Sequence, residues 1–566
     1  MTITHVNNEL NINHIHQTVT LRGWVSKSRR MGGMIFIDLR DRFGITQLTV
    51  DQQSRVYELA LTLRQEYVIL VSGVVVERQS KNPALSTGDI EVQLKDLTII
   101  NSSETPPIQV LDDTDALENT RLTYRYLDLR RPVQQRFLMM RSKITQAIRN
   151  VLLLDDFYEL ETPILGKSTP EGARDFLVPS RLYEAQFYAL PQSPQIFKQL
   201  YMIAGFEKYF QIARCFRDED LRADRQLEFT QVDIEASFVT QDDIIHLTEK
   251  MMVSLFKDVL NLEIKTPFLK MPYEEAILTY GSDKPDMRFD LLIHTLDASL
   301  KDAASPLLSL DHQAYILVDQ LLTRKEIDQL SELHKKHGGH ILSYAKKDAS
   351  NVSGPLTKHF SDTQLNALFQ SDTQTLLLST GTFHQVYEPL GAVRVDLGKM
   401  LNLIDDNAYK FLWVVDFPLF EYSEEDQRLY ARHHPFTSPK NADEMIKDPL
   451  NAKANAYDIV LNGYEIGGGS IRIYKQEMQQ KMFEMLGLKK EDIQSRFGFF
   501  TEALKYGTPP HGGIALGLDR LVMLMTKTEN IKDVIAFPKT QSARDMMMDA
   551  PSDVDAQQLK DIHFKE

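Results

Sequence analysis

The sequence predicts a multidomain protein of the α+β class, and three observations support this. A chain of 566 residues is too long for a single hydrophobic core, so three or four domains are expected. Residues 17–100 alternate apolar and polar side chains as strands do, whereas from Arg131 apolar residues recur every three or four positions as in helices. Residues 286–405 mix both patterns and are expected to form an inserted α+β domain.

The N-terminal region, residues 1–103, is expected to be a small β-barrel. Glycine, Asn and Asp residues separate five short stretches with strand alternation, namely VTLRGWV, GMIFIDLRD, GITQLTV, YVILVSGVVV and IEVQLKDLTII. Five strands in this length are typical of the OB-fold, a closed barrel that binds oligonucleotides in many proteins. A β-domain without a ligand is the alternative.

A basic stretch inside this region favours the ligand-binding alternative. Residues 22–42 carry six basic side chains against two acidic ones, a local net charge of +4 in a chain whose net charge is −15. The charge of the whole chain argues against indiscriminate coating of DNA or RNA, because phosphate contacts need clustered Lys and Arg. Phe36 lies within the stretch, and an aromatic ring flanked by cations suits unstacked bases.

Simple features exclude several classes of protein. A single cysteine, Cys215, excludes an internal disulfide framework and a cysteine-based zinc site. The polar N-terminus MTITHVNNELNINH has neither the basic nor the apolar region of a signal peptide. No apolar run approaches the roughly 20 residues that span a bilayer. The expected location is therefore the cytoplasm, with no membrane partner.

Residues 104–130 are expected to be a linker or hinge, and residues 131–285 and 406–566 the two parts of a larger domain around the insertion. The linker contains SETPPIQVLDDTD, with two prolines and several acids. A helix is predicted to follow it from about Pro132. The stretch FYELETPIL (157–165) is then predicted to be a strand, with its proline at an edge or bend.

Residues 211–238, QIARCFRDEDLRADRQLEFTQVDIEASF, are predicted to form a strand, a highly charged loop and a second strand. Side chains two residues apart on a strand share a face. One face of the second strand is apolar, and the other carries Phe229, Gln231, Asp233 and Glu235. Such a face either lies in solvent, which is the ordinary interpretation, or lines a binding site.

The stretch HGGIALGLDRLVMLM (511–525) is predicted to be a strand, a glycine and an apolar helix, with Asp519 as the helix N-cap. Arg520 then lies in the first helical turn, where backbone N–H groups and the helix dipole favour an anion. A capped helix after a strand is common, and by itself it assigns no function.

Residues 457–473, YDIVLNGYEIGGGSIRI, are predicted to be a β-hairpin, because the Asn-Gly dipeptide at 462–463 is a strong turn signal. Pairing outward from this turn sets Asp458 opposite Gly467. Asp458 and Glu465 are then diagonal neighbours on one face, within reach of a shared ion. Two such carboxylates suit Mg²⁺, which takes one or two protein oxygens with phosphates and water, and a salt-bridged surface hairpin is the alternative.

Two of these motifs resemble those of a known family. FRDEDLRADRQLEF (216–229) and GLDR (517–520) are similar to the second and third signature motifs of class II aminoacyl-tRNA synthetases, and essentially the whole chain resembles the bacterial-type aspartyl-tRNA synthetases of class IIb. The resemblance implies an antiparallel-sheet catalytic domain flanked by helices, a GAD-like insertion at 286–405 and an OB-fold that binds the anticodon. It implies an ATP-binding site of Arg217, Asp218, Glu219, Gln226, Phe229, Glu465, Gly517, Leu518, Asp519 and Arg520.

In this family the arginines of the two motifs are catalytic. The resemblance implies that Arg217 clamps the α-phosphate, that Arg520 contacts the γ-phosphate and that Phe229 stacks on adenine. An arginine suits the first role because its planar fork can hold phosphate oxygens while charge builds in the transition state. Asp458 and Glu465 are the expected Mg²⁺ ligands.

The expected amino acid pocket must hold a second carboxylate, which calls for buried cations. Arg472 and Lys198 match the family positions that bind the substrate side chain, the first as a fork and the second as a point charge. Asp233 either orients Lys198 or binds the substrate ammonium. The resemblance completes the aspartate-binding set as Glu171, Gln195, Lys198, Arg217, Asp233, His433, His434 and Arg472, with Glu171 on a mobile lid.

The resemblance implies an aspartate–tRNA ligase that acts as a homodimer. It would activate L-aspartate with ATP, release pyrophosphate and transfer aspartate to the 3′ end of tRNA-Asp, with tRNA-Asn as a second substrate in the non-discriminating alternative. The expected anticodon-binding residues are Lys27, Arg29, Phe36 and Gln47. Other hypotheses are an asparaginyl or lysyl relative, a catalytically silent paralogue and a simple OB-fold nucleic-acid binder.

Overall fold

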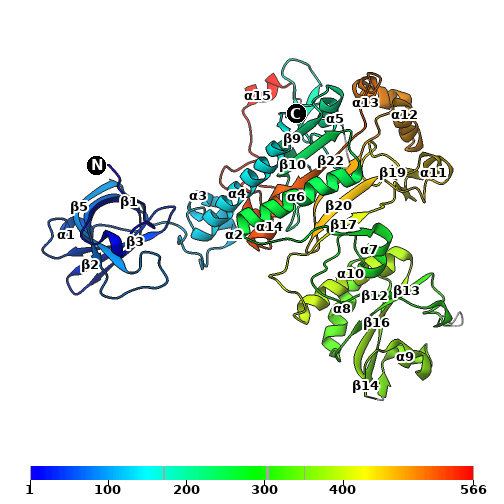
Figure 1. Cartoon of the computed structure of the whole chain (residues 1–566), viewed down its shortest axis with the longest axis horizontal. Helices are drawn as coiled ribbons and strands as arrows, with labels where there is room; N and C mark the ends of the chain where they lie inside the picture. Colours follow the sequence, from blue (N-terminus) through cyan, green and yellow to red (C-terminus); the bar gives the residue numbers. More distant parts are fainter. Residues whose placement is uncertain (1, 170–172, 301–304, 350, 565–566) are drawn as a thin grey trace. The chain divides into compact units, whose positions relative to one another are not determined.

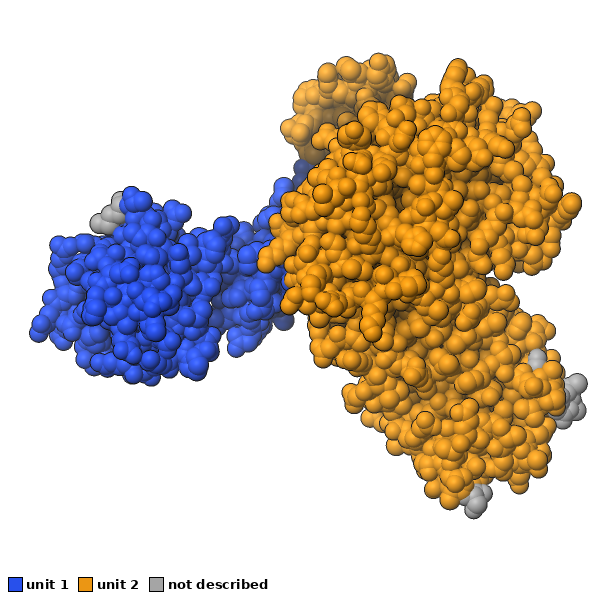
Figure 2. Space-filling model, viewed as in Figure 1, with its two compact units in different colours: residues 1–140, 532–553 blue, residues 141–531, 554–566 orange. Residues whose placement is uncertain are grey.

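The computed structural model describes residues 2–169, 173–300, 305–349 and 351–564. The chain forms two compact units (Figure 2), residues 1–140 with 532–553, and residues 141–531 with 554–566. The first unit contains a closed barrel, and the second contains two large sheets. None of the helices in the described ranges is long and apolar enough to cross a membrane.

The barrel in the first unit consists of the five predicted strands. They close in the order β1-β2-β3-β5-β4, and all neighbours are antiparallel except β3 and β5. The barrel is the blue domain of Figure 1. Alternate side chains point inward, so Leu21, Ile37 and Leu48 are fully buried in one apolar core. The elements are β1 (Thr18–Met31), β2 (Met34–Arg40), β3 (Ile45–Asp51), α1 (Tyr57–Leu61), β4 (Val68–Glu77) and β5 (Ile90–Asn101).

The expected linker, residues 104–130, is only partly extended. Residues 102–117 contain no helix or strand. Two short helices follow, α2 (Glu118–Thr123) and α3 (Arg125–Asp128). Arg125 is buried, and its guanidinium donates to Asp128 and to the carbonyl oxygen of Ala536. Since a buried guanidinium needs acceptors for its N–H groups, these contacts hold the second half of the linker in a defined conformation.

The second unit is built on an eight-stranded sheet with the order β11-β17-β20-β21-β22-β10-β9-β6. Its neighbours are antiparallel except at the two edges, where β11 is parallel to β17 and β6 is parallel to β9. Helices α5, α6 and α14 contact β9, β10 and β22 (Figure 1), which confirms the antiparallel sheet flanked by helices. The strands are β6 (Tyr158–Glu159), β9 (Lys208–Phe216), β10 (Glu228–Ser237), β11 (Leu269–Pro272), β17 (Phe411–Val415), β20 (Ala456–Leu461), β21 (Tyr464–Ile471) and β22 (His511–Gly517).

Further helices and two small sheets complete this region, and the first of these helices, α4, begins in the first unit. The helices are α4 (Pro132–Leu154), α5 (Gln195–Ile203), α6 (Gln241–Leu260), α7 (Tyr273–Tyr280), α11 (Ala442–Lys447), α12 (Gln476–Met485), α13 (Lys490–Ala503), α14 (Leu518–Thr526) and α15 (Ala556–Asp561). The small sheets pair β7 (Leu177–Pro179) with β8 (Phe187–Ala189), and β18 (Phe420–Ser423) with β19 (Arg428–Ala431). The helix predicted to follow the linker is therefore confirmed as α4.

The strand predicted for residues 157–165 is much shorter than expected. Only Tyr158–Glu159 pairs with β9. Pro163 has no N–H to donate and lies beyond the strand, and the Thr162 hydroxyl donates to the amide oxygen of Gln211 at 2.9 Å. A side-chain hydrogen bond thus replaces the backbone ladder where the proline approaches.

The region of the predicted insertion has its own five-stranded antiparallel sheet, with the order β12-β13-β16-β14-β15. Helices α8 and α10 pack on one face around Ile316 and Leu377, and α9 and η3 pack on the other face around Leu376 and Leu378. The elements are β12 (Ile293–Thr295), η2 (Ala298–Leu300), β13 (His312–Val318), α8 (Arg324–Lys336), β14 (Ile341–Asp348), β15 (Asn351–Ser353), η3 (Pro355–Lys358), α9 (Asp362–Leu368), β16 (Thr373–Gly381) and α10 (Phe383–Met400).

The buried His334 on α8 makes the stability of this fold depend on pH. Its Nε2 lies 2.8 Å from the Ser379 hydroxyl, and burial lowers the pKa of His334 to about 4 from its usual 6.5. Between these pH values the unfolded chain binds a proton that the folded chain does not, so the free energy of unfolding falls as the pH falls. When the pH falls from 7 to 5, the free energy of unfolding of the natural chain should drop by about 2 kcal/mol more than that of His334→Gln. Denaturant unfolding at the two pH values measures this, and equal losses in both chains would contradict it.

Candidate active site

A cleft of about 760 Å³ lies over β10, β21 and β22 of the eight-stranded sheet. Its lining is rich in charged side chains and brings together predicted residues that are far apart in the sequence. They are Gln195, Lys198, Arg217, Glu219, Gln226, Phe229, Asp233, His433, His434, Asp458, Glu465, Arg472, Gly517, Asp519 and Arg520. Of the remaining predictions for this site, Glu171 lies outside the described residues.

The polar face predicted for β10 borders this cleft. Phe229, Gln231 and Asp233 line it, and Glu235 follows on the same face, fully buried. Strand β10 lies between β9 and β22 in the interior of the sheet, with its apolar face covered. The shared face predicted from the alternation is therefore confirmed, and it is not a solvated surface.

The loop after β9 and the start of β10 bring a cation and an aromatic ring together. The Arg217 guanidinium lies 5.1 Å from the centroid of the Phe229 ring, and both side chains line the cleft. Glu219 forms a 3.1 Å ion pair with Arg225, and Gln226 is buried. A ring face beside a guanidinium can hold an aromatic base next to a phosphate.

Asp218, predicted for the same ATP site, does not line the cleft. Its carboxylate lies 3.6 Å from the Arg174 guanidinium, in a pair that is largely exposed. The reason is the extended backbone here, where Asp218 bridges to Arg174 as a strand residue does. Neighbouring side chains on extended backbone point to opposite sides, and Arg217 and Glu219 occupy the side that faces the cleft.

Helix α14 begins two residues earlier than predicted, and Asp519 does not cap it. The N-cap residue is Gly517, and Asp519 lies in the first turn. Its buried carboxylate accepts the Thr230 N–H at 2.7 Å and pairs with the Arg141 guanidinium. Leu518 is also buried and does not line the cleft. Both residues therefore fix α14 in place, and of the two only Asp519 also lines the cleft.

Arg520 lies in the first turn of α14, as predicted, and reaches the cleft. Its Nη2 is 3.1 Å from the Asp224 carboxylate, and its Nη1 donates to the carbonyl oxygen of Glu465. Within the described ranges its Nε is buried without a hydrogen-bond partner. A guanidinium with an uncommitted N–H group, beside the positive end of a helix, is a favourable place for an anion.

Asp458 and Glu465 lie close together on the β20–β21 hairpin, as predicted, but in a different register. A β-bulge beside residues 459–460 sets Asp458 opposite Gly468 and not opposite Gly467. A Cβ atom added to Gly468 would lie 2.6 Å from Asp458 Oδ1 and 3.7 Å from Glu465 Oε1, so both carboxylates cover this glycine. The turn signal does not reveal the bulge, which adds one unpaired residue to β21.

These two carboxylates fit a divalent cation. Burial and the neighbouring Asp458 raise the pKa of Glu465, while Arg520 and Lys284 oppose the rise. A cation between the carboxylates would relieve their repulsion. No group of three or more His, Cys, Asp or Glu side chains arranged for a metal occurs among the residues described here. Two protein carboxylates next to an anion site suit Mg²⁺, which relies on phosphates and water for its other ligands.

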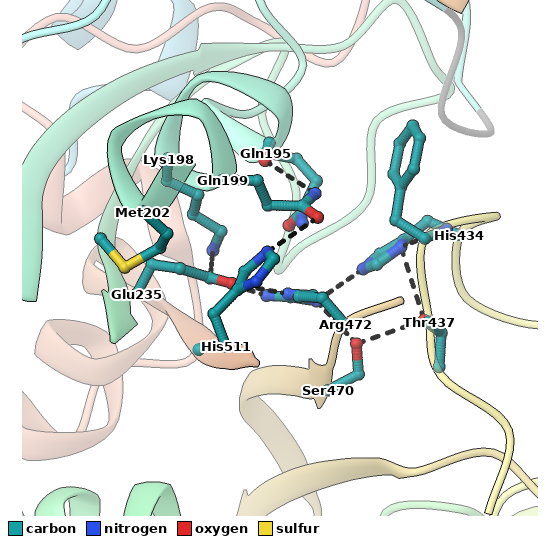
Figure 3. A network of polar contacts seen from close by, with 12 residues as sticks. Gln195, Lys198, Gln199, Met202, Glu235, His434, Thr437, Ser470, Arg472 and His511 are labelled. Carbon is teal, nitrogen blue, oxygen red and sulfur yellow. Dashed lines mark hydrogen bonds and ion pairs between the residues drawn. The ribbon is translucent and has the colours of Figure 1, made fainter. Parts of the chain in front are cut away.

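Four charged side chains, Lys198, Asp233, Glu235 and Arg472, form a buried cluster beside the cleft, and Figure 3 labels all of them except Asp233. Lys198, on α5, donates to Asp233 at 2.6 Å and lies 3.3 Å from Glu235. Arg472 follows β21 and donates to Glu235 from both Nε and Nη2, at 2.9 and 3.0 Å. None of the four side chains is more than 2% exposed. The two cations expected in an amino acid pocket are thus present, each with a buried counter-charge.

The two carboxylates of this cluster, Asp233 and Glu235, have pKa values shifted in opposite directions. Burial raises the pKa of Asp233, although Lys198 opposes the rise, and in the described part of the chain its Oδ2 has no hydrogen-bond partner. Burial also disfavours the charge on Glu235, but Arg472 and Lys198 outweigh it and hold the pKa of Glu235 below its usual value. Asp233 therefore orients Lys198 through one oxygen and leaves the other oxygen for a ligand, whereas Glu235 is committed to Arg472.

The two predicted histidines have different environments. Arg472 Nη1 donates to His434 Nε2 at 2.8 Å (Figure 3), and burial together with Arg472 holds the pKa of His434 well below its usual value. His434 is therefore neutral near pH 7. His433 lies 3.8 Å from the Asp458 carboxylate. Its Nδ1, like Nε2 of Gln195, is a buried atom without a hydrogen-bond partner in the ranges described.

Comparison with known proteins decides the family. Residues 117–541 match the family described as tRNA synthetases class II (D, K and N), and residues 19–100 match the OB-fold nucleic acid binding domain. The chain is 50% identical to the aspartate–tRNA(Asp/Asn) ligase of Anoxybacillus flavithermus, over 99% of this chain and 98% of that protein. It is 51% identical to the aspartate–tRNA ligase of Macrococcus caseolyticus, over 98% of this chain and 96% of that protein. The chain belongs to the aspartate–tRNA ligase family of class II tRNA synthetases.

Solved structures agree with this family in fold. The asparaginyl-tRNA synthetase from Pyrococcus horikoshii complexed with asparaginyl-adenylate has a TM-score of 0.61 and 20% identity, over 95% of this chain and 99% of that chain. The aspartyl tRNA synthetase from Entamoeba histolytica has a TM-score of 0.60 and 20% identity, over 95% of this chain and 91% of that chain. The α+β class, the OB-fold and the resemblance inferred from residues 216–229 and 517–520 are confirmed.

The second candidate surface of this aspartate–tRNA ligase family member is the outer face of the barrel. Lys27 and Arg29 on β1 lie across from Asp38 and Phe36 on β2, and Gln47 on β3 lies across from Asp38. Arg29 forms a 3.2 Å ion pair with Asp38. Gln47 is buried and donates to a carboxylate on β5 at 2.7 Å. The four predicted residues thus share one face, although the amide of Gln47 is already engaged within the barrel.

Several cleft residues of this family member carry no sequence signal. Asp224 meets Arg520, and Arg432 lies 3.4 Å from Asp283, but all of these contacts join segments distant in sequence. Glu235 is different, because alternation along β10 places it on the same face as Asp233. That alternation could have indicated its membership of the buried cluster.

Proposed function

We propose that this protein is an aspartate–tRNA ligase, which activates L-aspartate with ATP and transfers it to the 3′ end of tRNA-Asp. The observation that supports this most directly is the pair of buried cations, Lys198 and Arg472, in the same cleft as the phosphate-binding candidates Arg217 and Arg520. The substrate side-chain carboxylate would lie between the two buried cations. Its ammonium would meet the uncommitted oxygen of Asp233.

Charge explains the choice of amino acid. A guanidinium fork and an ammonium both favour a carboxylate. In a buried site this preference is large, because water cannot take the place of the carboxylate when an uncharged side chain binds instead. Asparagine would present an uncharged amide to Arg472 and Lys198, and lysine would add a third cation. Neutral His434 and Gln195 would complete the pocket by hydrogen bonds without changing its charge.

At the nucleotide end we assign adenine to Phe229, the α-phosphate to Arg217 and the γ-phosphate to Arg520. Glu219, Gln226 and the backbone at Gly517 would support ATP, since they line the same region. Asp458 and Glu465 would hold Mg²⁺. When bound, Mg²⁺ would neutralise phosphate charge and orient the leaving pyrophosphate.

The chemistry then needs no protein nucleophile. The aspartate α-carboxylate attacks the α-phosphorus in line, forming the acyl-phosphate bond of aspartyl-adenylate as the bond to pyrophosphate breaks. Arg217 stabilises charge that grows on the α-phosphate oxygens, and Lys198, Arg472 and Asp233 hold the attacking molecule in place. A 3′-terminal hydroxyl of tRNA next attacks the acyl carbonyl, and AMP leaves.

A second tRNA substrate is favoured by the names of the relatives. The name of the Anoxybacillus flavithermus ligase gives both tRNA-Asp and tRNA-Asn as substrates. The name of the Macrococcus caseolyticus ligase, aspartate–tRNA ligase, does not specify the tRNA. We therefore propose that this chain also charges tRNA-Asn. Charging of purified tRNA-Asn with labelled aspartate tests this, and no charging above a no-enzyme control would leave tRNA-Asp as its substrate.

We further propose that the enzyme is a cytoplasmic homodimer, acting where tRNA, ATP and aspartate are available together. Apolar side chains on and after α4 support the dimer, because Leu154, Tyr158 and Leu165 are 82%, 61% and 52% exposed. Strand β6 lies at the sheet edge beside them. An unpaired edge next to an apolar patch suits a self-complementary contact.

Aspartate-dependent ATP–pyrophosphate exchange tests the proposed activity directly. Exchange should occur with aspartate and be absent with asparagine or lysine. Stronger exchange with asparagine or lysine would assign the chain to another member of the scaffold. Exchange with none of the three, from a folded protein, would indicate a catalytically silent paralogue.

Phe36→Ala is expected to weaken tRNA charging but to leave pyrophosphate exchange unchanged. Loss of one stacked base costs about 1–3 kcal/mol, or about a 5- to 150-fold loss in kcat/KM for tRNA. Exchange involves no tRNA, so it should remain within twofold. Phe43→Ala, at an exposed phenylalanine between β2 and β3 of the same barrel, is the matched control. Equal losses in charging and exchange would contradict the assignment.

A further inference from the structure

The insertion contains a buried arginine that the proposed chemistry does not use. Arg394, on α10, is 1% exposed. Its guanidinium donates to the carbonyl oxygens of Asp286 and Phe289, at 3.0 and 2.9 Å, and to that of Leu291. It also stacks against the rings of Tyr280 and Phe289, at 4.9 and 4.1 Å from their centroids. One planar fork thus holds three carbonyl groups of residues 281–291, which we call the junction segment.

The face of α10 that carries Arg394 is shaped for close contact with this segment. Gly391, Arg394 and Gly398 are three and four residues apart and therefore share one helix face. A Cβ atom added to Gly391 would lie 2.3 Å from the carbonyl oxygen of Gly281, and one added to Gly398 would lie 2.8 Å from the Phe289 ring. Only glycines allow the helix backbone to approach this closely.

The other side of the junction segment meets the nucleotide end of the cleft. Asp283 lines the cleft and lies 3.4 Å from Arg432, which also lines it. The Cβ atom of Asp286 lies 3.1 Å from the position of a Cβ atom on Gly463, in the turn of the β20–β21 hairpin. This is the hairpin that carries the two candidate Mg²⁺ ligands. Lys284, also in this segment, interacts favourably with the carboxylate of Glu465 on that hairpin.

We propose that Arg394 is a positioning residue for the ATP–Mg²⁺ end of the active site, and that the insertion braces the hairpin that carries Asp458 and Glu465. This inference rests on the proposed function. Helix α10 holds the junction segment from one side, and the segment supports the hairpin turn from the other. If the fork of Arg394 is lost, the segment can shift, and Asp283 and Lys284 move relative to the hairpin carboxylates.

The effect is expected to be selective. Lys198 projects from α5, and Arg472 follows β21 at the opposite end of that strand from the turn. Their hydrogen bonds involve Asp233, Glu235, His434 and Ser470, none of which belongs to the junction segment. Weakened binding of ATP with Mg²⁺ should therefore leave aspartate binding intact. A role confined to folding of the insertion would affect both or neither.

Equilibrium binding by calorimetry, with Mg²⁺–ATP and with aspartate, tests the brace in the full chain. In Arg394→Lys and in Gly391→Ala the Kd for Mg²⁺–ATP is expected to rise about tenfold, as coupling through a packed network allows, while the Kd for aspartate stays within twofold. His334→Gln is the matched control, because His334 is buried in the same insertion but contacts Ser379 on β16. It should lower the midpoint of thermal unfolding without changing either Kd.

Two results would overturn the proposal. One is unchanged Mg²⁺–ATP binding in whichever of the Arg394 and Gly391 variants fold. The other is an equally large loss of Mg²⁺–ATP binding in His334→Gln. Neither result affects the proposed function, which depends on aspartate-dependent exchange by the natural chain. Absence of that exchange would instead contradict the proposed function itself.

Discussion

Arg217→Ala should abolish aspartate-dependent ATP–pyrophosphate exchange, with kcat reduced by about 10²- to 10³-fold or more. The guanidinium lies beside the Phe229 ring, where it can meet an α-phosphate next to adenine. The charge on that phosphate grows in the transition state, so removal of its cation raises the barrier more than it weakens ground-state binding. Exchange kinetics at saturating ATP and aspartate measure the effect.

The loop itself offers a control for this prediction. Arg222 belongs to the same charged loop but is exposed and does not line the cleft. Arg222→Ala should therefore keep exchange within twofold. Arg217→Lys retains the charge without the planar fork, and it should fall between the natural chain and Arg217→Ala. Near-normal exchange by a folded Arg217→Ala protein would refute the assignment of Arg217 to the α-phosphate.

Arg472→Met should remove aspartate recognition and destabilise the fold. Removing one partner of a buried ion pair costs about 3–5 kcal/mol, because the other charge stays buried. Here Glu235 is fully buried, and its remaining cation is Lys198 at 3.3 Å. The KM for aspartate in exchange should rise by at least about 100-fold, since a charged fork is lost. Denaturant unfolding and exchange kinetics measure the two effects.

A double variant separates stability from recognition. Glu235→Gln together with Arg472→Met removes the stranded charge and should recover most of the lost stability. It should not recover aspartate binding, because the substrate carboxylate still lacks its fork. Recovery of binding in the double variant would show that Arg472 acts only by neutralising Glu235, and that it does not contact the substrate.

The local patterns predicted most of the fold. Period-two alternation identified all five barrel strands, and the helical spacing after the linker identified α4. The errors occur where a local signal competes with a tertiary one. Pro163 truncates the expected strand to Tyr158–Glu159, and a bulge in β21 moves the partner of Asp458 from Gly467 to Gly468. The end of a strand at a sheet edge leaves no mark in the apolar pattern, and the glycines at 467–469 carry no side chains whose alternation would reveal the bulge.

Prediction of the site shows the same division. Residues predicted from motifs, among them Arg217, Phe229 and Arg520, converge in one cleft although they lie on separate elements. Asp519 is a residue type favoured at helix N-caps, yet its carboxylate pairs with Arg141 and accepts a hydrogen bond from the Thr230 N–H. A capping signal reflects only the adjacent backbone. It does not show that strands and helices packed against the residue present donors that need its carboxylate as an acceptor.

The sequence by itself therefore determined the order of domains, the class II motifs and the types of charge that a phosphate and a carboxylate require. These properties are local, because periodicity and motif spacing act over a few residues. Only the tertiary structure decided which charges pair. Glu235 binds Arg472 from across the sheet, and Arg394 joins the insertion to the segment beside the hairpin. Such pairs depend on distances between segments that are far apart in the chain. Burial sets their strength, because in low-dielectric surroundings a charge left without its partner is strongly destabilising.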